Sequence, residues 1–255
     1  MNHALQVAMI ESGHTAESLA AEIGVDPKTA ARWVTPGRIP QTRHRARVAE
    51  LVGRDVGDLW PDVLKRRHPT WLREWLEYER DARLLRWFEP ALVPGLLQTE
   101  AYAQAVIGWG GLFNVDEVDE LVASRIERQP VLDGRRPPQF FAMIDEAVVR
   151  RCVGSRAIMA EQCAHLVRLA ERPHVHIQVV PASAGGHAGL AGGFILAKGP
   201  YGEAAHLDDR LRAHVFNTQD DIDTLVAAWE AIRAVALSAP QTLDLIKEVA
   251  ATWQT

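Results

Sequence analysis

Apolar positions in the first sixty residues recur at helical intervals, in short stretches that are separated by glycine or proline. Each stretch carries one apolar side, which is typical of helices that pack around a shared core. The predicted helices cover residues 4–12, 16–23, 27–34, 41–52 and 56–60. We therefore expect a five-helix domain over residues 1–64.

Beyond this domain the pattern alternates between helical and strand-like spacing. Residues 65–69, KRRHP, join a charge run to a proline, so we place a linker at 65–74. Strand-like composition appears at residues 140–144, 175–180, 194–197 and 213–216. The predicted helices here cover residues 70–88, 96–107, 115–132, 145–152, 156–171, 221–236 and 240–253. The sequence predicts an α+β, mostly helical chain, whose second domain, 75–255, places helices around a small antiparallel sheet.

Residues 16–35, AESLAAEIGVDPKTAARWVT, have the pattern of a helix-turn-helix. Ala20 is small enough for two helices to cross closely, and Gly24 tolerates the positive φ that a sharp turn needs. Asp26 followed by Pro27 is a strong signal for the start of the second helix. The apolar residues that would pack this pair onto the domain are Leu19, Ile23, Val25, Ala30 and Trp33.

Charge distinguishes this pair of helices from a hairpin with a purely structural role. Residues 28–47 contain no Asp or Glu, and their basic residues are Lys28, Arg32, Arg38, Arg43, Arg45 and Arg47. A solvated helix face normally mixes both signs. The whole chain has a net charge of −5 and a pI near 6.1, so this basic patch stands against an acidic remainder. Such a patch is the electrostatic footprint of a phosphate-binding surface.

In helix-turn-helix proteins the second helix lies in the major groove, with its N-terminal part against the base edges. Lys28 and Arg32 are four positions apart, so they project from one helix face. We expect Arg32 to read a guanine through O6 and N7, and Ala31 to meet a thymine methyl. The remaining assignments are Thr29 for a base or a phosphate, and Arg38, Arg43 and Arg47 for phosphates. Arg45 projects from another side of its helix.

The N-terminal domain resembles the XRE family, the phage-repressor and Cro type of helix-turn-helix regulator. The resemblance spans residues 4–61, notably LAAEIGVDPKTAARWVTPGRIP and the closing LWP. It implies sequence-specific binding to double-stranded DNA by a homodimer, on an inverted repeat whose half-sites lie about one helical turn apart. Members often carry Gln where this chain has Ala16, which leaves Thr15 or the main chain to anchor the DNA backbone.

The second domain also resembles a known family. Residues 75–253 contain, in order, WFEPALVPGLLQTEAYAQAVI, RIERQPVL, DEAVVRRCVG, HIQVVP and GGHAGLAGGF. These segments are similar to an antitoxin-like domain of poorly known function that follows XRE domains in many actinobacterial regulators. The resemblance implies a regulator that pairs with a small protein encoded nearby or responds to a small-molecule effector.

The residues of the second domain leave two interpretations of its first loop open. Pro90, Pro94 and Gly95 fix a loop before a helix, which is typical of a packed elbow. Alternatively, polar side chains line a pocket for the ligand or partner. These candidates are Gln98, Glu100, Tyr102, Arg125, Arg128 and Gln129. Salt bridges around Glu127, or to Asp145 and Glu146, would be the more ordinary role of the arginines.

Neither a metal site nor an enzyme active site is indicated. His174 and His176 alternate on a predicted strand and could ligate zinc, but no third ligand stands at a diagnostic spacing. The chain lacks GxSxG, HExxH and GxxxxGK[ST] motifs. Asp145 and Glu146 stand at a predicted helix start, where acids usually serve the helix dipole. We therefore expect no catalytic activity, no metal and no cofactor.

Cysteine usage and hydropathy indicate the compartment. Cys152 and Cys163 are too far apart for CxxC chemistry, and we expect both to be buried free thiols in a reducing cytosol. The N-terminus carries Glu11 where a signal peptide needs apolar residues, and no apolar run is long enough to span a membrane. The sequence predicts a soluble, cytoplasmic protein.

These patterns favour a DNA-binding transcriptional regulator whose second domain binds a small molecule or a small protein. The rival interpretation is an antitoxin-like protein, which neutralises a neighbouring small protein and uses its DNA-binding domain only to autoregulate its own operon. Inspection of the adjacent genes would help to separate the two.

Overall fold

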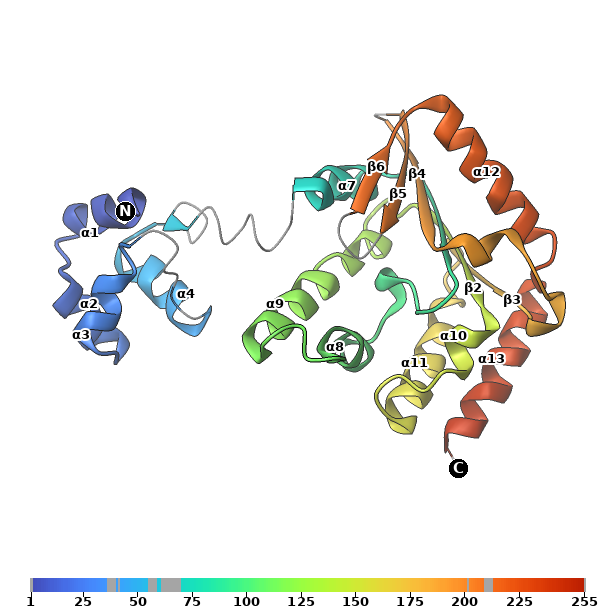
Figure 1. The fold of residues 1–255 in the computed structure, drawn as a ribbon, viewed down its shortest axis with the longest axis horizontal. Coiled ribbons are helices and arrows are strands. Elements are labelled where there is room, and N and C mark those ends of the chain that lie inside the picture. The colour runs from blue at the N-terminus through green and yellow to red at the C-terminus, as the bar shows by residue number, and fades with distance from the viewer. Residues whose placement is uncertain are drawn as a thin grey trace. The chain divides into compact units, whose positions relative to one another are not determined.

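The computed structural model describes residues 2–35, 40, 42–54, 59–60, 70–200, 202–208 and 213–254 (Figure 1). The chain forms two compact units, residues 1–69 and 70–255. The predicted linker, 65–74, spans this division: residues 65–69 lie outside the described residues, and α7 (Thr70–Arg80) begins directly after them. None of the helices in the described part of the chain combines the length and the apolar character that a membrane span needs.

The first unit is a bundle of short helices. They are α1 (His3–Glu11), α2 (Ala16–Ile23), α3 (Pro27–Arg32) and α4 (Thr42–Leu51). Their apolar sides form one buried cluster, which includes Leu5, Leu19 and Val48. The fifth predicted helix, 56–60, lies outside the described residues except for Leu59 and Trp60, which are buried in the same cluster.

The second unit is built on a six-stranded sheet with the order β3-β2-β1-β4-β5-β6. The strands are β1 (Leu84–Glu89), β2 (Gln139–Asp145), β3 (Val175–Val180), β4 (Phe194–Gly199), β5 (Gly202–Asp208) and β6 (Ala213–Phe216). The predicted class, α+β and mostly helical, is confirmed.

The sheet is mixed, which corrects the expectation of an antiparallel sheet. β1, β2 and β3 pair in parallel, whereas β4 pairs antiparallel with β1, and β5 and β6 continue antiparallel. Parallel pairing requires a crossover that brings the chain back to the same edge of the sheet. Helices α8 (Glu100–Gly108) and α9 (Val115–Ile126) provide the first crossover, and α10 (Glu146–Arg150) and α11 (Arg156–Leu169) provide the second.

The central strand, β1, was the element that the sequence pattern described worst. The helix predicted over 70–88 ends at Arg80, and Leu84–Glu89 forms β1 instead. β1 is hydrogen-bonded on both edges and packed on both faces, so its sequence, LLRWFE, lacks the simple alternation of a half-exposed strand. A short apolar run of this kind cannot be assigned to helix or strand by its period alone.

Helices cover both faces of the sheet (Figure 1). On one face, α11 and α13 (Ala239–Gln254) pack against Leu85 and Trp87 of β1 in one apolar cluster. On the other face, α12 (Gln219–Arg233) packs with Phe88 in a second cluster. This alternation follows from the opposite directions of successive side chains in a strand. Four short 3-10 turns complete the described elements: Gly95–Leu97, Gln129–Leu132, Ala182–Ala184 and Ala188–Ala191.

Candidate nucleic-acid interface

The turn between α2 and α3 has the geometry that the sequence predicts. Gly24 ends α2 in the left-handed conformation, with φ 77° and ψ 37°, which a residue with a side chain rarely adopts. Asp26 then caps α3, because its carboxylate accepts a hydrogen bond of 2.8 Å from the Lys28 backbone N–H. Pro27 occupies the first helical position, where no backbone donor is needed.

The start of α2 is closed by a reciprocal pair of hydrogen bonds. The Thr15 hydroxyl accepts from the Ser18 N–H at 3.2 Å, and the Ser18 hydroxyl accepts from the Thr15 N–H at 2.9 Å. The pKa of Glu17 is lowered, because its carboxylate accepts hydrogen bonds from its own backbone N–H and from the Thr15 side chain. Thr15 is exposed but already serves as the cap, so any contact with DNA would be additional to that role.

The inner face of the helix pair fixes α3 against the rest of the unit. Leu19 and Ala20 are each 1% exposed, and Ala30 and Trp33 on the α3 side are 2% and 5% exposed. The Trp33 ring also stacks on His44 of α4, with the ring centroids 6.3 Å apart. These contacts leave only one face of α3 available to solvent.

That outer face presents the predicted recognition residues. Lys28, Thr29, Ala31 and Arg32 are all exposed, whereas Ala30 between them is buried. Within the described residues, neither Lys28 nor Arg32 takes part in an ion pair, so both cations can meet an external anion without breaking a contact shown there.

The remaining predicted phosphate contacts have different surroundings. Arg47 is exposed and pairs with Glu50 at 2.7 Å, one turn further along α4. Arg38 lies outside the described residues, and Arg43 belongs to α4 with its side chain outside them. Arg45 donates from Nε to the Pro40 carbonyl at 2.7 Å, which holds the start of α4. A phosphate at Arg47 would therefore compete with Glu50.

In the second unit, the predicted ligand residues mostly hold the loop that follows β1. Gln98 is buried and donates to the Val93 carbonyl at 2.7 Å. The Tyr102 hydroxyl is buried and accepts from the Val93 N–H, and burial raises the pKa of Tyr102. Gln129 donates to the carbonyls of Gly95 and Gln98. Glu100 is exposed at the start of α8.

The two arginines of this group have partners that the sequence did not indicate. Arg125 donates from Nη1 to Gln98 Oε1 at 3.0 Å. Arg128 forms a two-pronged ion pair with Glu79, at 2.9 and 2.6 Å, in which Glu79 is only 3% exposed. The suggested salt bridges to Asp145 or Glu146 are wrong for these side chains. The packed-elbow interpretation accounts for the hydrogen bonds of Gln98, Tyr102, Arg125 and Gln129. It does not account for Glu100, which is exposed.

The histidines and carboxylates singled out in the sequence also have partners within the fold. His174 Nε2 lies 2.9 Å from the Leu132 carbonyl, and His176 stacks on Phe141 with the centroids 4.4 Å apart. Asp145 caps α10, and Glu146 accepts from the Ala182 N–H and pairs with Arg150. No group of three or more potential ligands is arranged for a metal ion in the described part of the chain.

The two cysteines differ from the expectation that both are buried. Both are free, Cys163 is buried, and Cys152 is exposed after α10. Burial raises the pKa of the Cys163 thiol to about 11. Cys152 lies two residues beyond the end of α10, outside any helix or strand, so its hydrophobic character alone was a poor guide to its burial.

The chain thus combines a helical unit, which has an exposed cationic helix face, with an α+β unit built on a mixed sheet. Residues 72–248 match the model of a family described as a domain of unknown function, DUF5753. This match covers more than half of the chain, and the chain belongs to that family. No curated protein and no solved structure matches the chain.

Proposed function

We propose that the chain is a sequence-specific, XRE-type transcriptional regulator that acts in the cytoplasm, and that its second unit binds a small molecule or a small protein. The observation that carries the proposal is the outer face of α3, where Lys28 and Arg32 are exposed four positions apart. Because Ala30 and Trp33 bury the opposite face, the two cations are held outward on a fixed helix. A helix of this kind fits the major groove of double-stranded DNA.

The proposed DNA site is an inverted repeat bound by a homodimer. A single short helix contacts few base pairs, so regulators of this type gain affinity and specificity by placing two recognition helices about one helical turn apart. The symmetry is inferred from the binding mode alone.

A test of this proposal begins with genomic footprinting, which defines the operator. In fluorescence anisotropy with that operator, we expect Arg32→Ala to lose preference at one base position, by about 1–3 kcal/mol. Arg43→Ala should instead weaken binding to all sequences and reduce the slope of the salt dependence by about 2, because each protomer of the homodimer loses one phosphate contact. The difference arises because a guanidinium on a base edge reads sequence, whereas one on a phosphate does not.

The matched control is Lys247→Ala, which removes one exposed positive charge from α13 in the second unit. We expect it to leave operator affinity and base preference unchanged. Equal, sequence-independent losses in Arg32→Ala and Arg43→Ala would contradict the division of roles. A wild-type protein with no preference for any sequence would contradict the proposed function itself.

A second candidate function, the antitoxin-like protein, is favoured by the loop between α8 and α9. Large apolar side chains are exposed in this loop, Trp109 by 74%, Leu112 by 82% and Phe113 by 46%, and Val115 at the start of α9 is exposed by 74%. Clustered exposed aromatic and aliphatic residues are typical of protein-binding hot spots. The adjacent first turn of α9 is acidic, with Asp116 and Glu117, which would suit a basic rim on the partner.

The test of this candidate is co-expression with the small protein encoded by the adjacent gene. We expect a complex whose affinity falls at least tenfold in Trp109→Ser, because truncation of a central aromatic anchor typically costs 2 kcal/mol or more (roughly thirtyfold). Leu190→Ser, at another apolar residue that is 64% exposed, serves as the control. Unchanged affinity in Trp109→Ser would remove this loop from the interface, and absence of any complex would leave the regulator without a protein partner of this kind.

A further inference from the structure

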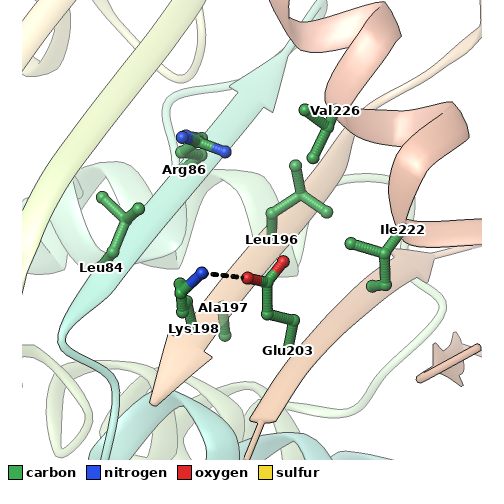
Figure 2. A pocket seen from close by; sticks show the side chains of 8 residues that line it. All are labelled: Leu84, Arg86, Leu196, Ala197, Lys198, Glu203, Ile222 and Val226. Atoms are coloured by element: carbon green, nitrogen blue, oxygen red, sulfur yellow. Dashed lines mark hydrogen bonds and ion pairs between the residues drawn. The ribbon is translucent and has the colours of Figure 1, made fainter. Parts of the chain in front are cut away.

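A pocket of about 260 Å³ lies on the sheet face that α12 covers (Figure 2). Its base is formed by side chains of β1, β4 and β5, and α12 contributes one wall. The volume equals that of roughly nine water molecules in the liquid. The pocket is therefore suited to a small molecule rather than to a folded segment.

Most of the pocket wall is apolar. Leu84 comes from β1, Leu196 from β4, and Ile222 and Val226 from consecutive turns of α12. Figure 2 shows Val226 and Leu196 on one side of the pocket, with Arg86 across from them. These side chains would contact an alkyl group and exclude water from around it.

Arg86 brings a positive charge into this apolar setting. Its side chain is only partly exposed on the sheet, and its neighbours in register on the two adjacent strands, Phe141 and Leu196, are apolar. Within the described residues, no carboxylate or other acceptor pairs with the Arg86 guanidinium. Partial burial of a cation is unfavourable unless an anion or acceptor compensates it.

The other charged residues of the pocket compensate each other. Lys198 of β4 pairs with Glu203, which lies opposite it on β5. Figure 2 shows this ion pair at the end of the pocket near Leu84. The lining therefore has one uncompensated positive charge, at Arg86. A ligand with a single negative charge balances it, whereas a second negative charge would face Glu203.

From this arrangement we infer that the pocket binds a small monocarboxylate with a short alkyl chain, whose carboxylate is held by Arg86 and whose chain lies against α12. The planar guanidinium matches a carboxylate with two parallel hydrogen bonds. This inference rests on the proposed function in one respect, because it identifies the class of effector that the second unit senses. The binding itself requires only the second unit's own residues.

The probe is sodium octanoate, which has ten non-hydrogen atoms, titrated into the full-length protein in the absence of DNA by isothermal titration calorimetry. The neutral comparison is octanamide, which has the same number of non-hydrogen atoms. We expect octanoate to bind with one-to-one stoichiometry and octanamide to bind at least tenfold more weakly. A charge-assisted pair of hydrogen bonds accounts for a difference of about this size.

Two variants test whether the octanoate lies in this pocket. Arg86→Leu removes the charge and should weaken octanoate binding at least tenfold, while the discrimination against octanamide disappears. Val226→Trp keeps Arg86 but fills the pocket from α12, and should abolish binding of both probes. Arg83→Leu removes an exposed positive charge that does not line the pocket, and should bind octanoate as the wild type does. Circular dichroism establishes that each variant is folded.

The inference is overturned if the wild type does not bind octanoate, or if folded Arg86→Leu and Val226→Trp both bind it as the wild type does. Octanoate binding in a protein that shows no operator preference would leave the pocket assignment intact and contradict the proposed function. Operator preference in a protein that does not bind octanoate would contradict the pocket assignment and leave the proposed function intact. The two failures are therefore distinguishable.

Discussion

Individual side chains differ in how well the sequence alone determines their place. Ala30 and Trp33 identify the buried side of α3, so the exposure of Lys28 and Arg32 could be predicted from helical spacing. The partner of Arg128 could not, because Glu79 lies 49 positions earlier in the chain. A buried ion pair between remote residues leaves no local pattern, and both residues resemble ordinary surface charges in the sequence.

The two thiols should react at very different rates with iodoacetamide at pH 8. Cys152 is exposed, whereas Cys163 is buried and its pKa is raised to about 11. Only roughly one Cys163 in a thousand is a thiolate at that pH, and the thiolate is the reactive form. We expect intact-mass spectrometry to find one adduct on the native protein and two after denaturation.

The control for this labelling experiment is Cys152→Ser, which should remain unlabelled in the native state. A second adduct on the native protein that appears as fast as the first would show that Cys163 is accessible. The part of α11 that contains Cys163 would then have to expose this side chain readily to solvent.

At the scale of elements, capping and turn residues were the most informative parts of the sequence. Asp26-Pro27 marked the start of α3, and Gly24 marked the end of α2, because each satisfies a local backbone requirement. The strand pairing was not predictable in the same way. The direction of β2 relative to β1 depends on the crossover between them, and that crossover is a property of the assembled sheet.

The ion pair between Glu79 and Arg128 joins α7 to the segment that follows α9, and its loss should lower the stability of the fold. In Glu79→Ala, Arg128 stays largely buried without its carboxylate, and the Trp75 indole N–H loses its acceptor at 3.2 Å. We expect a loss of about 3–5 kcal/mol in the free energy of unfolding, measured by urea denaturation.

Glu77→Ala is the matched control, because Glu77 is exposed on the same helix. Its effect should remain within about 0.5 kcal/mol. Similar stabilities of the two variants would indicate that the buried pair contributes little beyond a solvated one.

On the scale of the whole molecule, charge is divided unevenly between the two units. Residues 1–69 carry a net charge of +2 and residues 70–255 a net charge of −7, with histidine neutral. The second unit therefore contributes repulsion to any nearby polyanion, and attraction must come from the first unit alone. With this division of charge, we expect non-specific binding to DNA to be weak, so that specific contacts contribute a large share of the total affinity for an operator.

The salt dependence of operator binding should report this small number of phosphate contacts. Three arginines per protomer, Arg38, Arg43 and Arg47, would release about six counterions in a homodimer, which predicts a slope near −5 for log K against log salt concentration. Raising the salt from 50 to 200 mM should therefore weaken binding by about a thousandfold. A slope near −1 would be incompatible with phosphate contacts from both protomers.

The position of β1 in the middle of the sheet has a consequence for synthesis of the chain. Leu84 pairs with Gln139 on one side and with Lys198 on the other, so β1 leaves the ribosome well before either neighbouring strand. Until they emerge, its backbone donors and acceptors have no native partners, and the nascent chain presents an apolar segment at risk of misassembly. The helices of the first unit contact one another over short sequence distances and can close during that interval, so a ribosome-bound intermediate would contain the helical bundle of the first unit before the sheet exists.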